Sequence, residues 1–112
     1  MAYNIEKEYI SATLIDKEVE FEDEIVYLPN LVECVKIVCP NATVFIAPNL
    51  EKGTVWADNA TEINLPNLVK GYVFANKATE INLPNHVEGY VYCNKNAIVT
   101  IHKDFNGEII RR

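Results

Sequence analysis

Acidic side chains occupy every second position of a short stretch near the N-terminus. The stretch carries Asp16, Glu18, Glu20, Glu22 and Glu24. On one β-strand these carboxylates would share a face at intervals of about 6.7 Å, comparable with neighbouring phosphates on a nucleic-acid strand. The spacing suggests a surface that a basic nucleic-acid-binding protein would take for its ligand. Two alternatives stay open: a solvated edge strand blunted by charge, and a divalent-cation site, although no EF-hand spacing supports the latter.

Residues suited to catalysis or metal binding are few. Ser11 is the only serine, and the sequence contains neither a nucleophile elbow nor a phosphate-binding glycine loop. His86 and His102 have no cysteine or acid at a recognisable ligand spacing. We therefore expect no enzyme, no metal site and no cofactor, and we interpret each histidine as a solvated substitution at a corner of the fold.

Composition narrows the possible classes. The chain has 112 residues, 49% of them hydrophobic, which is enough for one domain with a buried core. Its net charge of −6 argues against nucleic acid as a direct ligand. No apolar run approaches the roughly 20 residues that span a bilayer, and residues 1–6 do not read as a signal peptide. Three cysteines are too few for a disulfide scaffold, so we expect a cytoplasmic protein with no membrane partner.

An 18-residue repeat organises most of the chain. Residues 60–77 read ATEINLPNLVKGYVFANK and residues 78–95 read ATEINLPNHVEGYVYCNK. All the glycines keep this period, as do three prolines that each precede an asparagine. These residues are Gly53, Gly71, Gly89 and Gly107, and Pro48, Pro66 and Pro84. The predicted repeats are residues 23–41, 42–59, 60–77, 78–95 and 96–112, and residues 1–22 are predicted to form an N-terminal capping segment.

Each repeat has the pattern of two short strands and two corners. Residues 63–65 and 72–75 alternate with period two, as strands do. The segment between them starts with proline and ends with glycine, so it is a corner. Eighteen residues leave no room for a helix of ordinary length as well. The sequence therefore predicts an all-β, single-domain parallel β-solenoid of about five coils. The crossover preference of parallel strands favours a right-handed coil. The six-residue spacing of Ile63, Val69 and Ala75 leaves open the left-handed alternative, as in hexapeptide solenoids. Residues 5–14 of the cap are either a strand or a short helix.

Stacking of the coils assigns the inward-facing columns. The first column holds Val26, Phe45, Ile63, Ile81 and Val99, and the second holds Leu28, Ala47, Leu65, Leu83 and Ile101. The third holds Ile37, Val55, Val73, Val91 and Ile109, and the fourth holds Cys39, Ala57, Ala75, Cys93 and Arg111. Cys39 and Cys93 would lie three coils apart, about 14 Å, which is too far for a disulfide. We expect both to be separate buried thiols, whereas Cys34 lies at an irregular insertion and is a candidate for exposure.

Aromatic residues alternate with the inward valines of one strand. If the valines point inward, the outward positions carry Trp56, Tyr72, Phe74, Tyr90 and Tyr92. Such a patch is too large for an idle surface, and aromatic rings are good anchors for a protein interface, including a homodimer. Two alternatives place the rings elsewhere: the N-terminal segment covers them, or the register is reversed and they form the core.

The unit LPNLVKGYVFANKATEIN resembles the short leucine-rich-like or β-helical repeats found in tandem in bacterial and bacteriophage proteins. The resemblance covers roughly residues 23–110 and implies a scaffold for surfaces, without catalytic residues. Combined with the acidic stretch, it leads to the hypothesis of a phage-type inhibitor that occupies a basic groove of a host defence or CRISPR-like protein in the host cytoplasm. The rival hypothesis is a structural or assembly module that self-associates through the aromatic face or the coil ends.

Overall fold

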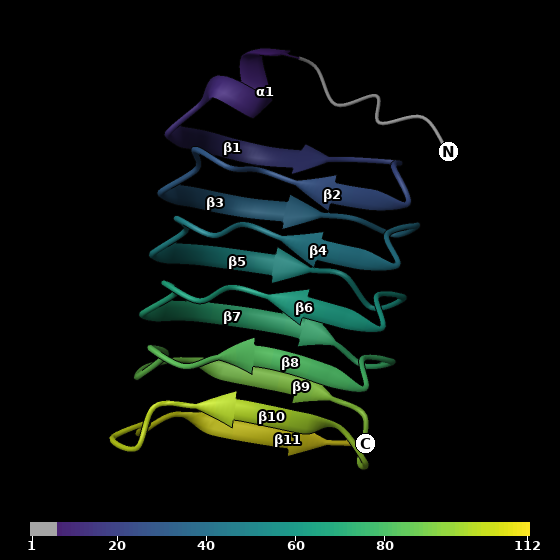
Figure 1. The fold of residues 1–112 in the computed structure, drawn as a ribbon, viewed down its shortest axis with the longest axis vertical. Helices are drawn as coiled ribbons and strands as arrows, with labels where there is room; N and C mark the ends of the chain where they lie inside the picture. Colours follow the sequence, from purple (N-terminus) through teal and green to yellow (C-terminus); the bar gives the residue numbers. More distant parts are fainter. Residues whose placement is uncertain (1–6) are drawn as a thin grey trace.

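The computed structural model describes residues 7–112, which form a β-solenoid of about five stacked coils (Figure 1). Each complete coil contributes one strand to each of two sheets, and the stack measures 35 × 24 × 18 Å. The predicted all-β solenoid with a repeat of about 18 residues is confirmed.

Every strand pairing in the two sheets is parallel. The six-stranded sheet contains, in order, β1 (Leu14–Glu20), β3 (Glu33–Val38), β5 (Lys52–Trp56), β7 (Lys70–Ala75), β9 (Tyr90–Cys93) and β11 (Glu108–Arg111). The five-stranded sheet contains β2 (Ile25–Tyr27), β4 (Val44–Ile46), β6 (Glu62–Asn64), β8 (Glu80–Leu83) and β10 (Ile98–Ile101). One helix, α1 (Lys7–Ser11), precedes β1 in the described chain.

The predicted inward columns fill the space between the sheets. Val73 pairs in register with Val55 and Val91, and all three are fully buried. Cys39 and Cys93 are buried free thiols, as predicted. Burying one valine or leucine side chain stabilises a fold by about 1.5–3 kcal/mol. Each coil buries several such side chains only against its neighbours, so contacts between successive coils hold the solenoid together.

Asparagine side chains fasten the corners from one coil to the next. At the proline corner, the Nδ2 of Asn49 donates to the carbonyl of Pro29 at 2.6 Å. The Nδ2 of Asn67 donates in the same way to the carbonyl of Pro48 at 2.8 Å. These bonds satisfy carbonyls that no strand partner reaches, which explains why an asparagine follows each corner proline.

The glycine column brings successive backbones into very close contact. A Cβ on Gly71 would lie 1.8 Å from the carbonyl oxygen of Gly53, and a Cβ on Gly89 would lie 2.0 Å from that of Gly71. Gly89 also has a φ of +126°, which residues with side chains rarely adopt. Any side chain in this column would push two coils apart. This explains why a glycine recurs every 18 residues along the chain.

The N-terminal cap is shorter than predicted. The predicted capping segment spans residues 1–22, but β1 already belongs to the six-stranded sheet, so only residues before it can cap the stack. Within the described part, α1 lies at the end of the solenoid (Figure 1), and the Tyr9 ring meets Phe21 edge-on at 5.4 Å. The helical alternative for residues 5–14 is therefore correct for Lys7–Ser11; residues 1–6 lie outside the described residues. None of the helices described is long and apolar enough to span a membrane.

The final coil is less well buried than the others. Val99, Ile101 and Ile109 continue fully buried columns but are only half-buried themselves. The guanidinium Nη1 of Arg111 donates to the carbonyl of Ala97 at 2.7 Å and so satisfies one acceptor at this end. Packing is thus densest in the middle coils and weakest at the C-terminal coil.

Candidate functional site

The outward aromatic side chains of the six-stranded sheet form the strongest candidate site, here called the aromatic face: Trp56, Tyr72, Phe74, Tyr90 and Tyr92. Trp56, Tyr72 and Tyr90 are 38%, 47% and 43% exposed, and the other two are half-buried. The valines between them are fully buried. The predicted register is therefore confirmed, and the alternative in which the rings form the core is wrong.

The described N-terminal segment leaves these rings uncovered. Tyr9 and Ile10 pack against the hydrophobic core at the end of the stack, beyond β1. The aromatic face begins two strands further along the sheet, at β5. The alternative in which the N-terminal segment covers the rings is thus not found for residues 7–22.

The rings stack on one another in two rows. In one row, Phe74 lies between Trp56 and Tyr92, with ring centroids 4.8 and 4.6 Å apart. In the other, the rings of Tyr72 and Tyr90 are 5.2 Å apart with an interplanar angle of 16°. Stacking along the solenoid axis turns the ring edges and hydroxyl groups outward, and it fixes the rings before any partner arrives.

Cations cover both ends of the longer row. The Nζ of Lys36 lies 4.5 Å from the ring centroid of Trp56, and the guanidinium carbon of Arg112 lies 5.1 Å from that of Tyr92. Both are cation–π contacts, in which the positive group is attracted to the electron-rich ring face. The outermost ring faces are therefore occupied within the chain itself.

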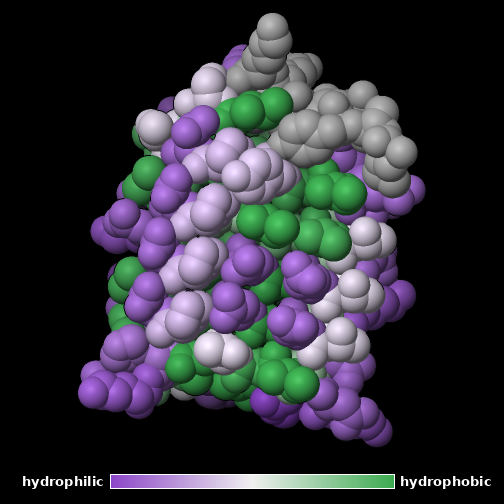
Figure 2. All heavy atoms as spheres, in the orientation of Figure 1, coloured by the Kyte–Doolittle hydropathy of each residue, from purple (hydrophilic) through white to green (hydrophobic). Residues whose placement is uncertain are grey.

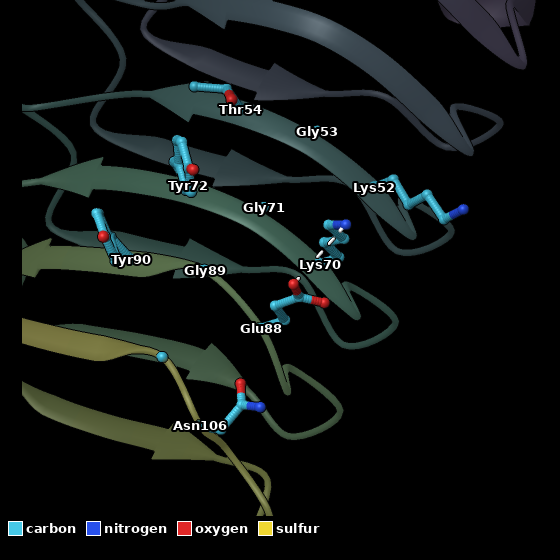
Figure 3. Close-up of a pocket in the computed structure, with 11 residues that line it drawn as sticks. Lys52, Gly53, Thr54, Lys70, Gly71, Tyr72, Glu88, Gly89, Tyr90 and Asn106 are labelled. Atoms are coloured by element: carbon cyan, nitrogen blue, oxygen red, sulfur yellow. Dashed lines mark ion pairs between the residues drawn. The ribbon is translucent and has the colours of Figure 1, made fainter.

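A groove of about 550 Å³ runs along the sheet beside the shorter row (Figure 3). Its floor is the glycine column, where no side chain can stand. Figure 3 shows Tyr72 and Tyr90 on one side of this floor and Lys70 and Glu88 on the other. Lys70 and Glu88 form an ion pair with each other at 3.8 Å. The predicted sites did not include this groove, although a glycine stands two positions before each of Val55, Val73 and Val91.

The acidic stretch is not one evenly spaced strand face, which corrects the prediction. β1 ends at Glu20, so Glu22 and Glu24 lie beyond it. A register shift between Ile15 and Glu18 also breaks the alternation, and Asp16, Lys17 and Glu18 are all exposed. Bulges of this kind are typical of sheet edges. The observed geometry matches the alternative of a charged edge strand better than a regular row of carboxylates.

The acidic groups have partners within the chain. The carboxylate of Glu18 lies 3.5 Å from the Nζ of Lys36, and the Nδ2 of Asn41 donates to Glu22 at 2.8 Å. A hydrogen bond with Glu22, together with its negative charge, raises the pKa of the Glu20 carboxyl. Glu20 and Glu22 therefore lie close together, and negative charge is concentrated at this corner of the sheet.

The acidic strand and the aromatic face belong to the same surface. Glu18 pairs in register with Lys36, and Glu20 pairs with Val38, whose strand lies beside β5. Sequence reasoning treated the two features as separate sites, because it placed residues 1–22 outside the repeats. The structure joins them into one face with acids at one end and aromatic rings in the middle.

The outer face of the five-stranded sheet has the opposite character at its centre. Figure 2 shows a hydrophilic group in the middle of this face, with hydrophobic residues on either side along the stack. Exposed Glu62 and Glu80 and the hydrogen-bonded amides of Asn64 and Asn82 occupy the central strands. The aromatic concentration is therefore particular to one side of the solenoid.

The prediction of solvated histidines is wrong for His86, which is fully buried. Its ring packs 5.3 Å from that of Phe105, and neither ring nitrogen makes a hydrogen bond of good geometry. Burial lowers the pKa of His86 to about 4, and backbone groups at Val69 and Gly71 offset only part of this effect. His102 is half-buried, and its Nδ1 accepts from the backbone of Asp104 at 3.0 Å.

The remaining reactive groups are dispersed. Cys34 is 6% exposed, which corrects its predicted exposure, and burial raises its pKa to about 11. Within residues 7–112, no three side chains of histidine, cysteine, aspartate or glutamate are grouped closely enough to hold a metal ion.

Comparison with protein families, curated proteins and solved structures finds no match to this chain.

Proposed function

We propose that this protein is a non-catalytic binding module whose partner is another protein, and that it docks through the outer face of the six-stranded sheet. The observation that carries the proposal is the aromatic face itself, with Trp56, Tyr72 and Tyr90 between 38% and 47% exposed. Exposed aromatic clusters of this kind are rare on monomeric surfaces and frequent in protein interfaces.

The arrangement has the features of an efficient docking surface. Stacking holds the rings in place, so binding would cost little side-chain entropy. Tyrosine and tryptophan contribute most to interface energies when a polar rim excludes water around them. Here the rim is provided by Lys36, Lys52 and Glu108, which lie in or beside the same columns.

A second candidate is a basic, nucleic-acid-binding partner at the acidic edge, as in a phage-type inhibitor acting on a defence protein in the host cytoplasm. The concentration of charge around Glu20 and Glu22 favours it, because a compact negative patch attracts a basic groove and speeds association. The irregular spacing of the carboxylates makes this a charge-based attraction, without a match to the phosphate spacing.

Affinity capture from a host lysate with three forms of the protein tests both candidates. The wild type is compared with Tyr72→Glu/Tyr90→Glu and with Glu18→Lys/Glu20→Lys/Glu22→Lys, each at low and high salt. We expect the aromatic variant to lose a partner that the wild type retains at high salt, since apolar contacts are insensitive to screening. Loss only in the acidic variant, and only at low salt, would assign binding to the edge. Capture that survives in both variants would contradict both candidates.

A further inference from the structure

One outward column of the six-stranded sheet is symmetric about β7, and the neighbouring column carries opposite charges at its two ends. From β3 to β11, one column reads Val38, Trp56, Phe74, Tyr92 and Ile110: an aliphatic residue at each end and aromatic rings between. The neighbouring column reads Lys36, Thr54, Tyr72, Tyr90 and Glu108, with opposite charges at its ends. A surface with this order is complementary to its own copy when the stack is turned end over end.

We propose that the partner on the aromatic face is a second copy of this chain, docked face to face around a two-fold axis that runs along β7. This inference rests on the proposed function and names its partner. Rotation about that axis reverses the order of the coils, so each column faces the same column of the second copy. β3 then faces β11 of the second copy, and β5 faces β9. Closed two-fold dimers are the commonest form of self-association, and they need a self-complementary patch of this kind.

Most of the facing pairs are favourable, and the exceptions are Thr54, which meets Tyr90 of the second copy, and Lys70, which meets its own equivalent. Trp56 meets Tyr92 of the second copy, and Phe74 meets its own equivalent on the axis. Lys36, which already lies 3.5 Å from Glu18 of its own chain, meets Glu108 of the second copy as a further acidic partner. In the column beside the groove, Lys52 meets Glu88, because Lys52 and Glu88 lie one strand to either side of Lys70. Lys70 meets its own equivalent, but its charge is already offset by Glu88 of the same chain at 3.8 Å.

Other two-fold arrangements of the same faces are less favourable. A two-fold axis along the solenoid would bring β1 against its own copy. In that arrangement the two acidic β1 strands, with Glu18 and Glu20, would face each other. In the proposed arrangement the acidic β1 lies beyond the facing β11, so its carboxylates stay in solvent. Like charges placed opposite one another disfavour an interface strongly, so charge selects the arrangement centred on β7.

The available area suits a modest but specific dimer. The two longest dimensions of the molecule are 35 and 24 Å, so its whole face offers about 800 Å², close to the area per partner of a standard interface. The symmetric columns cover only part of this face, from β3 to β11. We therefore expect a dissociation constant in the micromolar range, roughly 1–100 μM.

Sedimentation equilibrium with charge-reversed variants tests the arrangement. Lys36→Glu and Glu108→Lys should each raise the dimer dissociation constant at least tenfold or so, because the two-fold axis places each reversed contact in the interface twice. The double variant Lys36→Glu/Glu108→Lys should return to within about threefold of the wild type, since its facing charges are opposite again. Glu62→Lys, on the other sheet, is the matched control and should leave the constant unchanged.

The proposed dimer would be overturned by a wild type that stays monomeric up to about 1 mM, by a double variant as weak as the single ones, or by an equal effect of Glu62→Lys. Thermal melting checks that each variant is folded, and Glu108→Lys alone still tests the facing contact if Lys36→Glu is unstable. A monomer whose aromatic variant still loses a captured protein would remove the dimer and keep the proposed function. A dimer that resists Tyr72→Glu/Tyr90→Glu would contradict the use of this face altogether.

Discussion

His86 is the residue whose environment differs most from what its type requires. It stands where the preceding repeats have leucine, as at Leu68, and it is equally buried. Its two ring nitrogens lose their hydrogen bonds to water and gain none of good geometry in return. A buried unsatisfied polar group of this kind costs about 1–3 kcal/mol. The leucine of the previous coils shows that this position does not need a polar side chain for the fold.

We therefore predict that His86→Leu increases the stability of the protein by about 1–3 kcal/mol at pH 7. The gain should grow as the pH falls. Burial holds the pKa of His86 at about 4 in the folded state against an ordinary value of 6.5, so the unfolded chain takes up the proton first. Between pH 7 and pH 5 this linkage should cost the wild type about 2 kcal/mol that the variant keeps.

Urea unfolding of the two proteins at pH 7 and pH 5 measures this difference, and groups common to both cancel. Leu68→His, in the coil before, is the matched control and should add a second acid-sensitive site. An equal loss of stability in the wild type and His86→Leu on acidification would show that His86 has hydrogen-bond partners in solution.

At the scale of the elements, the glycine column decides how closely the coils of the six-stranded sheet can stack. Gly71→Ala would place a methyl group 1.8 Å from the carbonyl oxygen of Gly53, a separation that only movement of the backbone can relieve. We predict a loss of at least about 3 kcal/mol of unfolding free energy. Lys70→Ala, one position earlier, removes only an exposed ion pair and should cost less than about 0.5 kcal/mol. Chemical denaturation compares the two, and equal losses would show that the column tolerates a wider spacing.

The periodic strands were predictable because a fixed 18-residue repeat leaves the register no freedom. Once Val73 points inward, alternation sends Tyr72 and Phe74 outward, and stacking repeats this choice in every coil. The corner prolines mark where strands end, so the fold and the aromatic face followed from the pattern. The predicted corner was too long at its other end, because Gly53 and Gly71 lie inside β5 and β7.

The errors about the acidic stretch and Cys34 fall where the repeat is interrupted, whereas the error about His86 falls inside a regular repeat. The alternating acids between residues 16 and 24 read as one strand, but the chain turns a corner after Glu20 and bulges before Glu18. A second bulge in β3, between Glu33 and Lys36, accompanies the burial of Cys34. A one-residue insertion changes which side chains point inward. The position of the resulting bulge is determined by pairing with the neighbouring coil.

At the scale of the whole molecule, stability should decrease from the middle of the stack to its C-terminal end. A solenoid is held by contacts between neighbouring coils, so each coil is as stable as the coils on either side allow. Cys39 lies in an early coil, and its backbone N–H donates a hydrogen bond to the carbonyl of Trp56 in the next coil at 2.8 Å. Cys93 lies beside the last strand, β11, whose core residue Ile109 is only half-buried.

The two thiols therefore report local opening at different points of the stack. Burial raises the pKa of both thiols, although the positive charge of Arg111 opposes the increase at Cys93, so neither reacts appreciably while its coil is closed. We predict that a thiol-alkylating reagent modifies Cys93 at least about fivefold faster than Cys39 under native conditions, because opening of the final coil alone exposes it. Mass spectrometry of pulse-labelled protein measures both rates, and in urea they should converge once global unfolding dominates. Equal rates in the absence of denaturant would mean that the whole solenoid opens as one unit, and that half-burial of the last coil does not weaken it.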